Sequence, residues 1–184
     1  MSGHSHWAGI KHKKEITDHK RGKVFSKLVA LISAAAKTEP NPDFNPRLRT
    51  AVATAHAAGV PQEKIERAIK RASEAAEGLE ELTFEAYGPA GAAIIIESIS
   101  NNHNRAVQEL KTILRDYHGK WAESGSVLWA FAKRPQNNDN GGWDAKFPQE
   151  IADDAERAKL VELLEALEDN DDVQNVFTNI VFPE

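Results

Sequence analysis

Residues 83–100 read TFEAYGPAGAAIIIESIS, and this stretch decides the fold of the second half of the chain. TFEAY and AAIIIESIS are rich in β-branched and aromatic side chains, which favour strands. Gly-Pro-Ala-Gly stands between them at 88–91, a combination typical of turns and unlike a glycine-rich nucleotide-binding loop. The stretch therefore predicts a β-hairpin.

The residues after the hairpin alternate between helix and strand patterns. Asn101, Asn102 and Asn104 offer capping groups for a helix that Gly119 would end. The predicted elements are a helix over 106–118, a strand in SVLWAFAK (126–133), a loop at 135–144, a helix over 154–169 and a strand over 173–182. The order β-β-α-β-α-β predicts an α+β fold, a sandwich in which helices cover one face of a mostly antiparallel sheet.

The residues before the hairpin predict three short amphipathic helices. The first starts near Val24, the second follows a capping Asn45 with Pro46 at its first position, and the third is opened by Pro61. Gly59 suits a left-handed end of the second helix. We therefore expect a basic arm at 1–22, a three-helix bundle at 23–78 and an α+β domain at 79–184.

Charge is distributed unevenly along the chain, whose net charge is −5. Residues 1–71 hold 14 Lys/Arg and 6 Asp/Glu, whereas residues 72–184 hold 9 and 22. A basic segment on an acidic protein can neutralise phosphates and release their counterions, which drives binding to nucleic acid. The acidic remainder would repel a polyanion, so the N-terminal half is expected to meet it.

The candidate binding residues combine an aromatic ring with many cations. Trp7 could stack on an unpaired base or instead anchor the arm on the bundle, and both interpretations stay open. Arg47 and Arg49, at the start of the second helix, could contact phosphate or simply face solvent. The predicted nucleic-acid-binding residues are Trp7, Lys11, His12, Lys13, Lys14, Lys20, Arg21, Lys23, Lys27, Arg47 and Arg49.

Composition disfavours several other classes of protein. The chain has no Cys, which excludes disulfides and thiolate metal sites and fits a reducing, cytoplasmic location. No apolar stretch approaches the roughly 20 residues that span a bilayer, and no secretion signal is evident. We find no catalytic constellation, no metal site and no need for a cofactor, so we do not expect an enzyme.

Seven motifs, in order from end to end, closely resemble the YebC family, which includes probable transcriptional regulators and mitochondrial translational activators. They are GHSHWAGIKHKK (3–14), DHKRGKVFSKL (18–28), NPRLR (45–49), YGPAG (87–91), NNHNR (101–105), GSV (125–127) and LEDNDDVQNV (167–176). The resemblance implies a helical N-terminal domain, α/β domains behind it and a cytosolic location. The family's arm motif falls on Gly3, His4, Ser5, Trp7, Ile10, Lys11, His12, Lys13 and Lys14, with His6 where Lys is usual.

The chain departs from the family pattern after Arg134. Family members usually carry a further α/β domain between the strand ending near Lys133 and the acidic final helix, and here the loop at 135–144 stands in its place. Because the flanking strand and helix can still pair, a short loop can replace that domain without opening the core.

These observations predict a non-enzymatic nucleic-acid-binding regulator. We favour an rRNA-binding translation factor or activator that acts at the ribosome. The resemblance to the family implies that it relieves ribosome stalling. Its partner would be the ribosome, through rRNA or tRNA. The alternative is a DNA-binding transcriptional regulator, for which the second and third helices offer few Asn or Gln side chains to read bases. No dimer seam is evident, so we expect a monomer without membrane contact.

Overall fold

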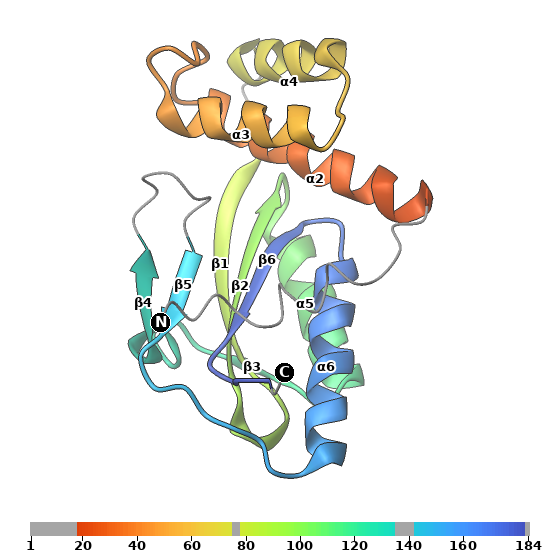
Figure 1. Cartoon of the computed structure of the whole chain (residues 1–184), viewed down its shortest axis with the longest axis vertical. Coiled ribbons are helices and arrows are strands. Elements are labelled where there is room, and N and C mark those ends of the chain that lie inside the picture. The colour runs from red at the N-terminus through yellow and green to blue at the C-terminus, as the bar shows by residue number, and fades with distance from the viewer. Residues whose placement is uncertain (1–17, 75–77, 135–141, 183–184) are drawn as a thin grey trace.

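The hairpin predicted at 83–100 is present at the centre of a four-stranded antiparallel sheet (Figure 1). The computed structural model describes residues 18–74, 78–134 and 142–182. The strand order is β3-β1-β2-β6, with β1 at Glu80–Tyr87, β2 at Ala93–Ser100, β3 at Lys120–Ala122 and β6 at Val173–Thr178. The α+β fold class is confirmed.

The turn of the hairpin packs against a helix of the same domain. It is a short 3₁₀ turn, η1 (Pro89–Gly91), preceded by Gly88. A Cβ atom on Gly88 would lie 2.9 Å from the terminal methyl groups of Ile94 and Leu160, so a larger residue would require those side chains to shift. The glycine thus lets the turn approach helix α6 (Asp154–Asp169).

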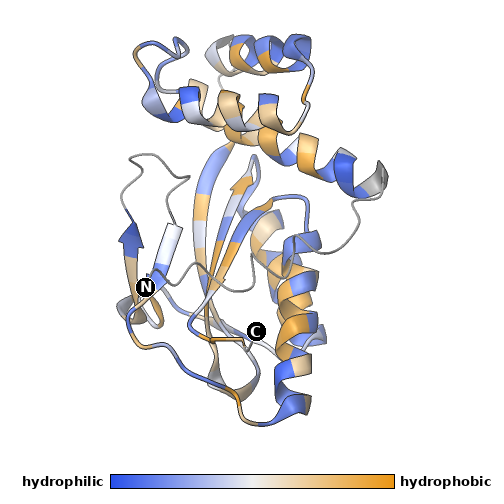
Figure 2. Cartoon of the chain, viewed as in Figure 1, coloured by the Kyte–Doolittle hydropathy of each residue, from blue (hydrophilic) through white to orange (hydrophobic). Residues whose placement is uncertain are grey.

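Strand β2 is buried on both faces of the sheet. Ile94 and Ile96 pack into a core with helices α5 (His103–Asp116) and α6. Ala93 and Ile95 point to the opposite face, into a smaller core with Phe131. This explains why β2 is a nearly continuous apolar run rather than an alternating one, and Figure 2 shows the hydrophobic residues along β2 and α6.

Side-chain caps begin both helices of this domain, as the sequence predicts for α5. Asn102 accepts a hydrogen bond from the Arg105 N–H at 3.0 Å, and Asp153 caps α6 in the same way. The end of α5 differs from the prediction: His118, not Gly119, has the left-handed backbone, with φ 64°. Space is tight at Gly119, where a Cβ would lie 2.8 Å from a terminal methyl group of Leu114.

The segment that covers the second face of the sheet corrects two predictions. In SVLWAFAK only β4 (Phe131–Arg134) is a strand, and Leu128–Ala130 forms a 3₁₀ turn, η2. The buried residues there follow a three-and-four spacing rather than alternation. The predicted loop at 135–144 ends in strand β5 (Gly142–Ala145), which pairs with β4, and residues 135–141 lie outside the described part.

Three helices form the predicted bundle: α2 (Asp18–Ala36), α3 (Pro46–Ala57) and α4 (Gln62–Glu74). Their core includes Ile32, Leu48 and Ile65. Asn45 caps α3 by accepting from the Leu48 N–H, and its amide donates to the carbonyls of Ala35 and Glu39. Gly59 is left-handed, with φ 82°, as predicted.

Helix α2 begins earlier than the sequence pattern indicates. The predicted arm extended to residue 22, yet residues 18–22 are helical. The last of them, Gly22, is exposed, and nothing lies within 4 Å of the position of a Cβ, so packing does not require a glycine there. None of the described helices is long and apolar enough to cross a bilayer.

Candidate nucleic-acid interface

The predicted binding residues fall into two groups. Trp7, Lys11, His12, Lys13 and Lys14 lie outside the described residues, and their role stays a prediction. The other six are placed on α2 and on the first turn of α3. Lys20 and Arg21 are exposed in the first turn of α2, directly after the arm.

Lys23 and Lys27 contact the C-terminal end of α6. The Lys23 ammonium donates to the Asp169 carbonyl at 2.7 Å and lies 3.8 Å from the Asp171 carboxylate. The Lys27 ammonium donates to the Glu168 carbonyl at 2.5 Å. Helix α6 has no basic residue in its own last turn, so these lysines supply the positive charge that a helix C-terminus favours. The structure thus gives both lysines an intramolecular role.

Arg47 bridges the bundle and the sheet. Its guanidinium forms an ion pair with Glu81 of β1. Burial lowers the pKa of Arg47, and the nearby Glu97 carboxylate opposes that shift. A phosphate contact at Arg47 would have to compete with Glu81.

Arg49 organises the loop before α3. Its Nε donates to the Pro42 carbonyl at 3.2 Å and its Nη2 to the Asp43 carbonyl at 3.0 Å. The side chain is exposed, so the guanidinium satisfies backbone acceptors at the surface. Contacts with other parts of the protein are thus made by Lys23, Lys27, Arg47 and Arg49.

Helix α4 adds a cationic face that the predicted site omitted. Lys64, Lys70 and Arg71 are exposed on it, and Arg67 forms an ion pair with Glu63. Helix α4 lies at the end of the molecule farthest from the sheet (Figure 1). The helical spacing of these residues in the sequence was the signal for this surface.

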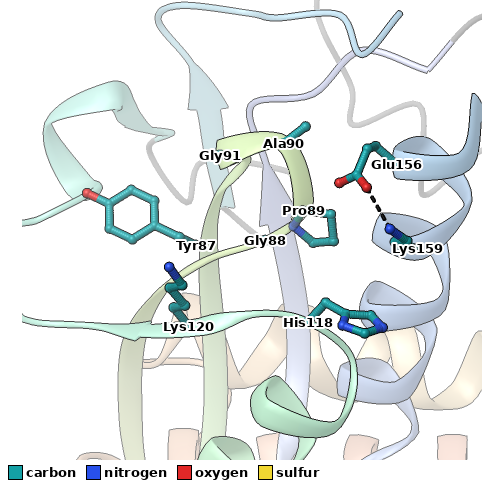
Figure 3. A pocket seen from close by; sticks show the side chains of 9 residues that line it. All are labelled: Tyr87, Gly88, Pro89, Ala90, Gly91, His118, Lys120, Glu156 and Lys159. Atoms are coloured by element: carbon teal, nitrogen blue, oxygen red, sulfur yellow. Dashed lines mark hydrogen bonds and ion pairs between the residues drawn. The ribbon is translucent and has the colours of Figure 1, made fainter. Parts of the chain in front are cut away.

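The hairpin turn is flanked by an open hollow of about 520 Å³, drawn in Figure 3. Lys120 and His118 line it, and Lys159 donates to the Glu156 carboxylate at 2.7 Å. That hydrogen bond raises the pKa of Lys159. A phosphate would have to compete with Glu156 for Lys159. The geometry therefore favours the prediction that residues 88–91 form a structural turn and not a nucleotide-binding loop.

A buried carboxylate in the α+β domain has a structural role. Glu85 is 3% exposed and accepts hydrogen bonds from the N–H groups of Gly125, Val127 and Leu128 at 2.5, 2.7 and 3.0 Å. It orders the loop before β4 rather than serving as a free base. Among the residues the structure describes, no group of His and acidic side chains is arranged to hold a metal ion.

Two family models match the chain along most of its length. The TACO1/YebC protein N-terminal domain matches residues 5–75, and the TACO1/YebC second and third domain matches residues 79–138. The chain therefore belongs to the TACO1/YebC protein family. The resemblance inferred from the sequence motifs is confirmed.

Similar proteins carry the description "probable transcriptional regulatory protein". One from Desulfosudis oleivorans is 50% identical over 137 residues, covering 73% of this chain and 56% of that relative. One from Koribacter versatilis is 37% identical, covering 99% of this chain and 96% of the relative. The crystal structure of a conserved hypothetical protein from Aquifex aeolicus superposes with a TM-score of 0.88 at 32% identity, covering 98% of each chain.

The chain is shorter than these family members. Its alignment with the Koribacter protein runs over 238 residues, although the chain has 184, so that relative has residues without a counterpart here. The second-and-third-domain match stops at residue 138, between β4 and β5. This is where the sequence indicated a missing inserted domain.

Proposed function

We propose that this TACO1/YebC family member is a non-enzymatic regulator that binds RNA, acting as an rRNA-binding translation factor at the ribosome. The uneven charge of the chain carries the proposal. Residues 18–74, which form the bundle, hold 11 Lys/Arg against 6 Asp/Glu, and the arm adds three lysines at 11, 13 and 14. The α+β domain is acidic and would stay away from a polyanion.

The proposed binding surface combines the arm lysines with exposed cations of the bundle. The exposed cations are Lys20 and Arg21 at the start of α2, and Lys64, Lys70 and Arg71 on α4. Lys23, Lys27 and Arg47 would contribute only if phosphate displaced their contacts with α6 and β1. The arm should therefore supply most of the electrostatic affinity.

The descriptions of the relatives favour a second candidate, a DNA-binding transcriptional regulator. Such a protein needs a helix whose side chains read base edges in the major groove, where Arg and Lys read guanine and Asn and Gln read adenine. On α4 the only Asn or Gln is Gln62, and its amide donates to Glu66 at 2.7 Å. The RNA proposal needs no base-reading helix.

Ribosome co-sedimentation over a series of salt concentrations tests the proposal. The full chain is compared with a variant in which Lys11, Lys13 and Lys14 are changed to Gln. Ribosome binding should weaken. A plot of the logarithm of the association constant against the logarithm of the salt concentration has a negative slope, and this slope should become less steep by about 2 if all three lysines contact phosphates.

A control variant changes three exposed cations of the acidic domain, Lys111, Lys120 and Lys146, to Gln. It should leave ribosome binding unchanged. Equal loss in both variants, or tighter binding to one DNA duplex than to ribosomes, would contradict the proposal.

A further inference from the structure

A cleft of about 320 Å³ lies between the bundle and the end of the sheet. Side chains of α2 and α3 form one side, and side chains of β1, β2 and β6 form the other. Its volume lies within the range of small-molecule sites. It is about ten times the roughly 30 Å³ share of one water molecule in the liquid.

Two buried polar groups line this interdomain cleft without a partner. Ser98 of β2 is 2% exposed, and its hydroxyl makes no hydrogen bond to the described residues. The same holds for the side-chain amide nitrogen of Gln174 on the neighbouring strand β6. Buried polar groups are nearly always hydrogen-bonded, so this pair calls for a ligand with hydrogen-bonding edges.

The backbone is irregular at the same point. The pairing of β2 with β6 shifts register between Glu97 and Ser98. Such bulges often lie beside functional sites because they redirect a side chain. Here the irregularity coincides with the serine that lines the cleft.

The walls and the rim of the cleft differ in character. Leu28 and Leu31 of α2 face Leu82 and Ile99 of the sheet and supply apolar surface. Charged residues of both signs line the cleft. The cations are Lys27, Arg47 and Lys133, and the acids are Glu81, which pairs with Arg47, and Glu97. The Lys133 ammonium lies 5.4 Å from the centroid of the Trp143 ring. A ligand that suits this site has a flat apolar body, polar edges and an attached anionic group.

We infer that the interdomain cleft receives one unstacked nucleobase of the bound RNA, an inference that rests on the proposed function. Ser98 and Gln174 hydrogen-bond to the edge of the base, the leucines contact its faces, and the rim cations lie near its phosphate. Sequence-specific contacts to single-stranded RNA commonly use bases splayed out in this way. The arm leads directly into α2, which forms one wall of the cleft.

A preference for one base over the others would distinguish binding in the cleft from binding to phosphates alone. The probes are fluorescent ten-residue A, C and U oligoribonucleotides, measured by anisotropy with the full chain at several salt concentrations. Contacts to phosphate alone do not distinguish these sequences. The cleft should produce a preference of about threefold or more for one of them.

Ser98→Ala and Gln174→Leu should each bring the affinities for the three oligoribonucleotides close to equal and leave the salt slope unchanged. Ser98→Ala should keep or raise the melting temperature, because the hydroxyl it removes has no partner. Ser124→Ala, at an exposed position outside the cleft, is the matched control and should change neither quantity.

The outcomes separate the two proposals. Loss of base preference in the cleft variants, with arm-dependent binding retained, supports the inference. Arm-dependent binding with no base preference, or with a preference that both cleft variants keep, overturns the cleft inference alone. Binding that ignores the arm lysines overturns the proposed function, and the cleft inference with it.

Discussion

At the level of single residues, two buried polar side chains fix the ends of elements. Asn45 and Glu85 are 9% and 3% exposed, and each bonds to three backbone groups. Buried polar groups with complete partners are costly to remove, since the backbone groups lose their partners too. Replacing either residue should therefore lower the free energy of unfolding, although both side chains are polar.

Glu85→Ala should lower the free energy of unfolding by about 2–4 kcal/mol, because three backbone N–H groups lose a charged acceptor. Urea unfolding measures the effect. Glu123→Ala, an exposed acid in the adjacent loop, should change stability by less than about 0.5 kcal/mol. Equal effects of the two substitutions would show that the buried hydrogen bonds do not stabilise the loop.

Asn45→Ala should cost about 2–3 kcal/mol, from loss of the helix cap and of two donated hydrogen bonds. Asn45→Ser keeps a cap acceptor but loses both donors, so its melting temperature should lie between those of the wild type and Asn45→Ala. If Asn45→Ser matches Asn45→Ala, the cap contributes nothing.

At the level of elements, the end of α6 depends on residues from α2. Lys23 and Lys27 donate to the last carbonyls of α6, and four acids lie at 168–172 around them. The contact joins positively charged and negatively charged segments of the same chain. It also lowers the number of α2 cations available to nucleic acid.

Replacing Lys23 and Lys27 together with Gln should reduce stability by about 1 kcal/mol at low salt. The loss should shrink in 1 M salt, since the Debye length there is about 3 Å. Thermal unfolding at the two salt concentrations measures this. Lys20→Gln is the control at an exposed position of the same helix, and a salt-independent loss would contradict the electrostatic explanation.

At the level of the whole molecule, the core of the bundle is separate from the cores of the α+β domain. The bundle core around Ile65 shares no buried residue with the core around Ile94 and Ile96. The ion pair and hydrogen bonds of Arg47, Lys23 and Lys27 connect the parts. Parts of a protein with separate cores can unfold independently of each other.

Ile65→Ala should therefore destabilise the bundle by about 2–4 kcal/mol and leave the sheet intact. Native-state hydrogen exchange should show faster exchange in α2, α3 and α4, with unchanged protection in β1 and β2. The reciprocal substitution, Ile96→Ala, should lower protection in the sheet. Uniform loss across both parts in Ile65→Ala would show that the chain unfolds as one unit.

Local sequence patterns were sufficient to predict the helices, the central hairpin and the charge asymmetry. Helical spacing, the Asn45 and Asn102 caps and the Gly-Pro-Ala-Gly turn act within a few residues, so they can be recognised without a structure. The irregular segment before β4 was wrongly predicted as a strand, because its short apolar run buries Val127, Ala130 and Phe131 without the alternation of a strand.

The long-range contacts of the cations and the position of the cleft could be found only from the packing of the elements. Lys23 donates a hydrogen bond to Asp169 of α6, 146 residues away in the sequence. Arg47 forms an ion pair with Glu81 of β1. Ser98 and Gln174 look unremarkable in sequence and become significant because β2 and β6 lie side by side beneath the bundle. Contacts of this kind depend on how elements pack, and packing brings together residues that no local pattern connects.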